Sequence, residues 1–209
     1  MPPFSFNFLL LAFHNELLYY YYYEFLSKEL LMVYILSGIF IFFIAMDQLS
    51  KSLAVNMLGQ VGAVQSFIPH FIRFEYRENT GMAWGLLPNA RVYFIIVTLI
   101  LAAFLVFLLV RYRKLLPKLS KVALTVILSG AIGNLIDRIF LGYVRDFIAF
   151  DFIEFPVFNI ADCCVTIGAV LLAVSLLLTK PGKDFIRQID SNDKKSNKSD
   201  NGEEGSNAE

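Results

Sequence analysis

Three aspartates stand at the ends of apolar segments in the stretch from Gly130 to Cys163, where carboxylates are unusual. Asp137 and Asp146 follow one apolar run, and Asp162 opens the next. An ionised carboxylate near hydrocarbon costs about 2.5 to 3.5 kcal/mol at a helix centre, so such residues usually face a hydrated cavity within the protein and mark function. We therefore predict that two of these aspartates form a catalytic pair at the membrane surface.

Asp146 and Asp162 are separated by a connection short enough to bring both carboxylates to one depth, provided that the helix ends are neighbours. Two close carboxylates cannot both ionise cheaply, so the pair shares a proton. The charged member can deprotonate a water while the protonated member donates to an amide carbonyl or leaving amine. Asp162 could instead only cap the following helix. Periodicity also leaves three rival acids, Asp137, Asp151 and Glu154.

Two further polar groups occur at helical spacing. Asn134, Asp137 and Arg138 stand at i, i+3 and i+4 and therefore project from one helix face. We expect them to support the reacting groups rather than to react. Asp47 and Lys51 stand at i and i+4, just past the first apolar run. They are either part of the site or a surface ion pair, which would contribute only about 0.3 to 0.5 kcal/mol.

The composition is typical of a membrane protein. The chain has 209 residues, of which 57% are hydrophobic and only 17% charged, more apolar than a soluble domain. The two cysteines, Cys163 and Cys164, are adjacent and cannot form a disulfide framework or a zinc site. We expect them to be small buried side chains, with no metal and no cofactor. The formal net charge of zero carries no information on partners. We expect no nucleic-acid partner for a membrane protein of this kind.

Four apolar runs approach the roughly 20 residues that a membrane-spanning helix needs. They cover residues 30–46, 92–110, 122–141 and 163–179. The predicted fold is an α-helical integral membrane protein, a compact bundle of four transmembrane helices. Residues 30–182 form this membrane domain. Residues 1–29 are aromatic but interrupted by polar groups, which predicts an interfacial or disordered extension, or a wrongly assigned start upstream of Met32. Residues 183–209 are predicted to be a disordered tail.

The basic residues predict the orientation of the spans. Residues 111–121 hold five Lys or Arg, and Lys180, Lys183 and Arg187 follow the fourth span. The connection from 143 to 162 holds only Arg145. By the positive-inside rule both termini are cytoplasmic and the aspartates face the other side. In the first outer connection, apolar and charged residues alternate from Ile72 to Arg77 before the turn residues 79–81, which predicts a small extracytoplasmic β-sheet or hairpin.

Five motif blocks then occur in a recognisable order: MDQLSK (46–51), ENTGMAW (78–84), GAIGNLIDR (130–138), VRDF (144–147) and FNIAD (158–162). With these blocks the chain resembles the lipoprotein signal peptidases, the signal peptidase II family of bacterial inner-membrane aspartic peptidases with four spans. The resemblance implies that Asp146 and Asp162 are catalytic. It also implies supporting roles for Asp47, Lys51, Asn79, Gly81, Asn134, Asp137, Arg138 and Asn159.

The same resemblance implies a substrate and a location. The enzyme would be a multi-pass inner-membrane protein, monomeric and surrounded by membrane lipid. Its active site would lie at the extracytoplasmic face. It would cleave prolipoproteins on the N-terminal side of a lipobox cysteine that carries a diacylglyceryl group. Residues 67–84 and 147–158 would clamp the substrate, and Trp84 would either anchor at the interface or pack ordinarily. Two positions depart mildly from the family pattern, Ser129 and Cys163.

Two other classes of membrane protein are alternatives. A small transporter would spread its polar residues through the depth of the bundle, whereas here they cluster at the outer end. A non-enzymatic adaptor gives no reason for five polar blocks that converge on one face.

Overall fold

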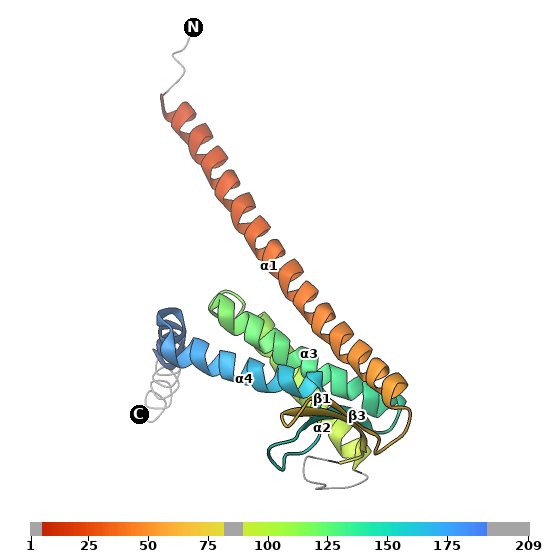
Figure 1. Ribbon diagram of the computed structural model, residues 1–209. Coiled ribbons are helices and arrows are strands. Elements are labelled where there is room, and N and C mark those ends of the chain that lie inside the picture. The colour runs from red at the N-terminus through yellow and green to blue at the C-terminus, as the bar shows by residue number, and fades with distance from the viewer. Residues whose placement is uncertain (1–5, 82–89, 192–209) are drawn as a thin grey trace, which may run out of the picture. The chain divides into compact units, whose positions relative to one another are not determined.

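The computed structural model describes residues 6–81 and 90–191, with side chains from residue 27 onward and at Glu24 (Figure 1). Four helices in the described part are long and apolar enough to cross a membrane. They are α1 (Phe6–Leu58, with the candidate span Ser27–Leu58), α2 (Arg91–Arg111), α3 (Lys118–Phe140) and α4 (Ile160–Leu178). This confirms the predicted four-helix membrane architecture.

The first helix is longer than predicted at both ends. Its backbone is helical from Phe6, so the disordered alternative for residues 1–29 is wrong from residue 6 onward, while the interfacial placement stays a prediction. The chain up to Gly38 forms a unit of its own, and the residues from Ile39 onward form a second unit. Helix α1 continues past Met46 to Leu58, and Asp47 and Lys51 pair with each other inside it.

Helix α3 is the buried centre of the second unit. Most of its residues are buried, whereas most residues of α2 are exposed and only four residues of α4 are buried. Figure 1 shows α3 and α4 running side by side. Small residues allow this approach: a Cβ on Gly168 of α4 would lie 2.6 Å from Ile127 Cγ1, and a Cβ on Gly133 of α3 would lie 3.3 Å from Ala161 Cβ. Close packing at small residues is a common way for helices to associate in lipid.

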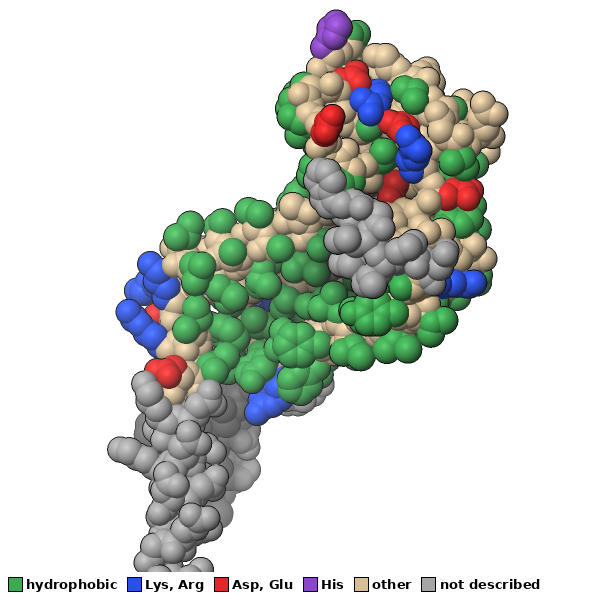
Figure 2. Space-filling model, turned by 90° about the horizontal axis from the view of Figure 1, so that it is seen from below, with side chains coloured by type: hydrophobic (Ala, Val, Ile, Leu, Met, Phe, Trp, Pro, Cys, Tyr) green, Lys and Arg blue, Asp and Glu red, His purple; other side chains and the backbone are tan. Residues whose placement is uncertain are grey.

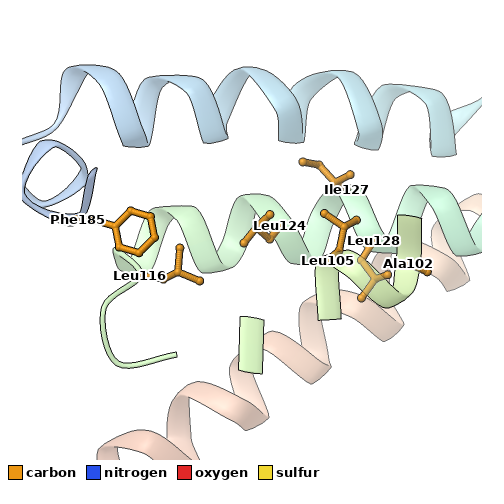
Figure 3. Close-up of a cluster of buried hydrophobic side chains, with 7 residues drawn as sticks. All are labelled: Ala102, Leu105, Leu116, Leu124, Ile127, Leu128 and Phe185. Atoms are coloured by element: carbon orange, nitrogen blue, oxygen red, sulfur yellow. The ribbon is translucent and has the colours of Figure 1, made fainter. Parts of the chain in front are cut away.

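A hydrophobic cluster joins α2, α3 and a further helix over residues 180–191 (Figure 3). Its members are Ala102, Leu105, Leu116, Leu124, Ile127, Leu128 and Phe185. The predicted disorder from residue 183 is therefore wrong for 183–191, because Phe185 is buried there and packs edge-on against Tyr112. Residues 192–209 lie outside the described part of the chain.

A three-stranded antiparallel sheet lies where α3 ends and α4 begins (Figure 1). Its order is β1 (Val64–Ile68), β2 (Ile72–Asn79) and β3 (Val144–Phe150). The sheet confirms the predicted β element, and it also contains a strand, β3, within the connection of residues 143–162, where no strand was predicted. A bulge between Phe74 and Arg77 shifts the register, so that Arg77 pairs with Asp146.

Large hydrophobic side chains remain exposed along α2 and α4, for example Ile100, Phe104 and Val170. On the face seen in Figure 2, hydrophobic side chains fill the middle, while charged side chains gather mainly at the two ends. An apolar surface this extensive is expected to face lipid in a membrane protein.

Candidate active site

Asp146 is placed on β3 and is 2% exposed. Its Oδ2 accepts a hydrogen bond from Asn79 Nδ2 at 2.9 Å, and its Oδ1 accepts one from Asn159 Nδ2 at 2.6 Å. Burial, and then the nearby charge of Asp162, raise the pKa of Asp146 to about 7. A carboxyl group with this pKa gains and loses a proton readily at neutral pH, as general acid–base catalysis requires.

Asp162 lies in the first turn of α4. Asn159 Oδ1 accepts the Asp162 N–H at 3.0 Å, and Asp162 Oδ2 accepts the Asn159 N–H at 3.1 Å, so the two form a capping box. The other carboxylate oxygen, Oδ1, accepts a hydrogen bond from Asn134 Nδ2 at 2.8 Å. The N-cap is therefore Asn159, and Asp162 does more than cap its helix, because it also reaches α3.

Asn159 connects the two aspartates. It is fully buried, and its side-chain and backbone N–H groups donate to Asp146 and Asp162 respectively. The backbone explains this position, because Phe158 pairs with Ile148 of β3 and thereby folds the start of α4 back onto the sheet. Two carboxylates 16 positions apart in sequence thus share one hydrogen-bonding partner.

Beneath the two aspartates lies a buried ionic network centred on Lys51. Its Nζ lies 2.8 Å from Asp47 Oδ2 and 3.5 Å from Asp137 Oδ2, and donates to Asn134 Oδ1 at 2.9 Å. Lys51 is 0% exposed and Asp47 1% exposed, so the surface-pair alternative for these residues is wrong. Asp47 Oδ1 also accepts the Ala161 N–H at 2.9 Å, which ties α1 to the first turn of α4.

The network contains two residues that sequence reasoning did not single out, Arg145 and Gln48. Arg145 Nη2 and Nε donate to the two oxygens of Asp137 at 2.8 and 3.2 Å. Gln48 Oε1 accepts from Arg145, while Gln48 Nε2 donates to Asp137 and Asp47. No local pattern identifies them, although Arg145 was visible as the single basic residue of its connection.

The two aspartates open onto a cavity of about 510 Å³. Its polar lining comprises Asn79, Gly81, Arg138, Asp146, Asp162, Cys163 and Thr166, and its apolar lining comprises Phe150, Phe155, Pro156, Val157, Phe158 and Ile167. The Gly81 N–H donates to Asn79 Oδ1 at 3.0 Å and so orients the Asn79 amide toward Asp146. The Arg138 guanidinium lies 5.1 Å from the Phe94 ring centroid.

The rival acids do not line this cavity. Asp137 is bound in the ionic network, Asp151 pairs with Arg73 at 2.7 Å at the edge of the sheet, and Glu154 is exposed. Cys164 is buried as expected, whereas Cys163 is half-buried and lines the cavity. Within the described ranges, no cluster of three or more His, Cys, Asp or Glu side chains could hold a metal ion. Trp84 lies outside those ranges.

Comparison with known proteins identifies the family. The family model described as signal peptidase (SPase) II matches residues 39–178. This chain belongs to the signal peptidase II family. The match confirms the resemblance that the five motif blocks indicated, and the chain is therefore a membrane-embedded peptidase. Every residue of the candidate site lies within the matched range.

Similar proteins cover most of this signal peptidase II chain. The lipoprotein signal peptidase of Enterococcus faecalis is 38% identical over 161 residues, which are 75% of this chain and 97% of that protein. That of Caldanaerobacter subterraneus is 42% identical over 142 residues, or 68% and 94%. Two solved bacterial membrane enzyme structures superpose with TM-scores of 0.63 and 0.62 at 34% and 33% identity. They cover 68% and 70% of this chain, and 87% and 94% of their own chains.

Proposed function

We propose that this signal peptidase II is an aspartic endopeptidase with Asp146 and Asp162 as its catalytic pair. The observation that carries the proposal is their common environment, because both carboxylates line one cavity and both accept hydrogen bonds from Asn159. In the working state the pair holds one proton. One aspartate takes a proton from the attacking water, and the other donates its proton to the amide carbonyl or the leaving amine.

The proposed substrate is a prolipoprotein whose lipobox cysteine carries a diacylglyceryl group, cut on the N-terminal side of that cysteine. The cavity supports this choice, because its lining combines the two aspartates with Phe150, Phe155, Phe158 and neighbouring apolar side chains. Burying a lipid chain in the membrane stabilises its attachment there by about 0.8 kcal/mol per CH₂. An anchored lipid chain holds the adjacent amide beside the aspartates in a fixed orientation, which favours the reaction.

The supporting residues have separate tasks in this proposal. Asn79 and Asn159 fix the carboxylate of Asp146, and Gly81 orients Asn79. Asn134 fixes Asp162 and is itself held by Lys51. The remaining supporting residues are Asp47 and Asp137, which neutralise the buried cation, and Arg138, whose charge interacts with both catalytic carboxylates.

In the proposed orientation both termini are cytoplasmic and the cavity lies at the extracytoplasmic surface. The charge distribution supports it, since Arg111, Arg113, Lys114, Lys118, Lys180 and Lys183 lie where α2 ends, where α3 begins and just after α4, whereas the strands precede α2 and lie between α3 and α4. The enzyme then meets precursors after their export. We propose that it acts as a monomer within membrane lipid.

A reconstituted cleavage assay tests the proposal. The purified full-length protein in liposomes is given a precursor with and without the diacylglyceryl group, and mass spectrometry locates the cut. We expect one cut immediately before the lipidated cysteine and little or no cleavage of the unlipidated precursor. Asp184→Asn, which changes an exposed acid outside both the cavity and the two clamping segments, should cleave like the wild type. Equal cleavage of both precursors, or a cut elsewhere, would contradict the proposed substrate.

A further inference from the structure

Arg145 occupies a junction of three elements in the structure. Its guanidinium binds both oxygens of Asp137 on α3, and its backbone N–H donates to Asp137 Oδ2 at 3.0 Å. Toward α1, Nη2 donates to Gln48 Oε1 at 2.9 Å and Nη1 to Ser52 Oγ at 3.3 Å. A planar guanidinium that forms paired bonds to a carboxylate fixes direction as well as distance.

Arg145 also immediately precedes Asp146 on β3. Successive side chains of a strand point to opposite faces, so Arg145 reaches down to the ionic network while Asp146 faces the cavity. Anchoring Arg145 therefore fixes the piece of backbone that presents Asp146. This contact is one residue away from a proposed reacting group.

The charges of the network are balanced through Arg145. The network contains two carboxylates, Asp47 and Asp137, and two cations, Lys51 and Arg145. Because Asp137 is held by the Arg145 guanidinium at 2.8 Å and lies 3.5 Å from Lys51 Nζ, Lys51 remains available to Asn134 Oδ1. Without Arg145 the network would carry one excess negative charge, and Lys51 would be drawn toward Asp137.

We propose that Arg145 is a positioning residue for the cleavage reaction, an inference that rests on the proposed function. By holding Asp137, it leaves Lys51 to orient Asn134, the amide that binds Asp162. Through its own backbone it fixes the strand at Asp146. It touches neither the substrate nor the water, and it sets both the geometry and the charge beneath the two aspartates.

The pH dependence of cleavage distinguishes this role from a purely structural one. The charged groups that act on Asp146 are Asp162 from α4, Lys51 from α1 and Arg138 from α3. Removing the positive charge of Arg145 adds a net negative charge behind them, which disfavours ionisation of Asp146 further. The pH at which activity falls on the alkaline side should therefore move upward.

The experiment compares three variants in liposomes with the lipidated precursor. Arg145→Met should lower kcat by about 10- to 100-fold with little change in KM, because a small misplacement of reacting groups is costly. The pH at which its activity falls to half on the alkaline side, the alkaline limb of the pH profile, should move upward by about 0.5 to 1 pH unit. Arg145→Lys keeps the charge, so it should recover part of kcat and leave the limb in place. The control is Arg187→Met, which removes an exposed arginine paired with Asp184 in the helix over residues 180–191 and should behave like the wild type.

The outcomes separate the inference from the proposed function. If the wild type does not cleave the precursor, the proposed function fails. If the wild type cleaves and Arg145→Met keeps its kcat and its pH profile, the proposed role of Arg145 is wrong. Should Arg145→Met not accumulate in the membrane, Arg145→Gln replaces it, because glutamine can still donate to Asp137 but carries no charge. The same shift of the limb is then expected, and an unmoved limb overturns the inference.

Discussion

Replacing Lys51 by methionine should destabilise the protein strongly, because this lysine is the buried counter-ion of two carboxylates. Its side chain is 0% exposed and its Nζ contacts Asp47 at 2.8 Å and Asp137 at 3.5 Å. Removing one partner of a buried ion pair typically costs about 3 to 5 kcal/mol, since a charge is left without compensation. Methionine has a similar length and fills the space, so the loss would reflect charge rather than a cavity.

A double-mutant cycle measures how much of this loss comes from the pair. Asp47→Asn removes the second charge but keeps an oxygen for the Ala161 N–H. The double variant Lys51→Met with Asp47→Asn should therefore be more stable than the sum of the single losses, with an interaction energy of about 1 to 3 kcal/mol. The assay is reversible unfolding of the detergent-purified protein, followed by tryptophan fluorescence and circular dichroism.

An exposed ion pair provides the matched control for this cycle. Arg187 and Asp184 lie 4.0 Å apart with side chains 80% and 55% exposed, so Arg187→Met should change the stability by less than about 0.5 kcal/mol. A loss below about 1 kcal/mol in Lys51→Met, or strict additivity in the cycle, would refute the view that a buried network supports the site.

Three further outcomes are expected. The cleavage rate should fall as pH rises through about 7, because the raised pKa of Asp146 marks the loss of the shared proton; a rate that is flat from pH 6 to 9 would contradict this. Asp137→Asn should reduce the yield of folded protein more than its turnover number, since the Asp137 carboxylate neutralises the charges of Arg145 and Lys51. Quantitative blotting and cleavage kinetics measure the two effects. The reverse pattern would require a revised catalytic pair. Gly133→Ala should lower the free energy of unfolding by about 1 to 3 kcal/mol, because its Cβ would lie 2.6 Å from Asp47 Oδ2. The control Gly38→Ala, whose Cβ meets nothing within 4 Å, should cause no such loss. Equal effects of the two substitutions would contradict close packing at Gly133.

The helices could be predicted from the sequence because hydropathy is a local property. The runs at 92–110 and 163–179 predicted α2 and α4 to within about three residues at each end. The apolar run that ends at Met46 does not mark the end of its helix, which continues to Leu58. Asp47 and Lys51 compensate each other within the helix, and a pattern of single residues does not show such pairing.

The site could be predicted only in part, because its geometry depends on contacts between distant segments. Asp146 and Asp162 stand out in the sequence as acidic residues beside apolar runs. Spacing alone, however, leaves three other acids as candidates for the catalytic pair. The pairing of Ile148 with Phe158 brings Asn159 between the two aspartates, and it joins segments across a loop. Arg145 and Gln48 were missed for the same reason, since each acts on partners from other elements.

The end of the chain shows the converse error. Residues 183–191 belong to the predicted disordered tail, yet they form a helix. Phe185 packs into the cluster beside Leu116 and Tyr112, and Ile189 packs against the same cluster. Burial of a single aromatic side chain contributes up to about 3 kcal/mol, and composition over a window does not reveal it.

The most direct test of the central claim is the cleavage rate of Asp146→Asn and Asp162→Asn, each measured with the lipidated precursor on protein shown to be inserted and folded. Asparagine keeps the size of each side chain and removes only its ability to carry the proton. We predict that each variant loses at least about a thousandfold in kcat while it still binds the precursor. Turnover within tenfold of the wild type in either folded variant would show that the two carboxylates are not the catalytic pair.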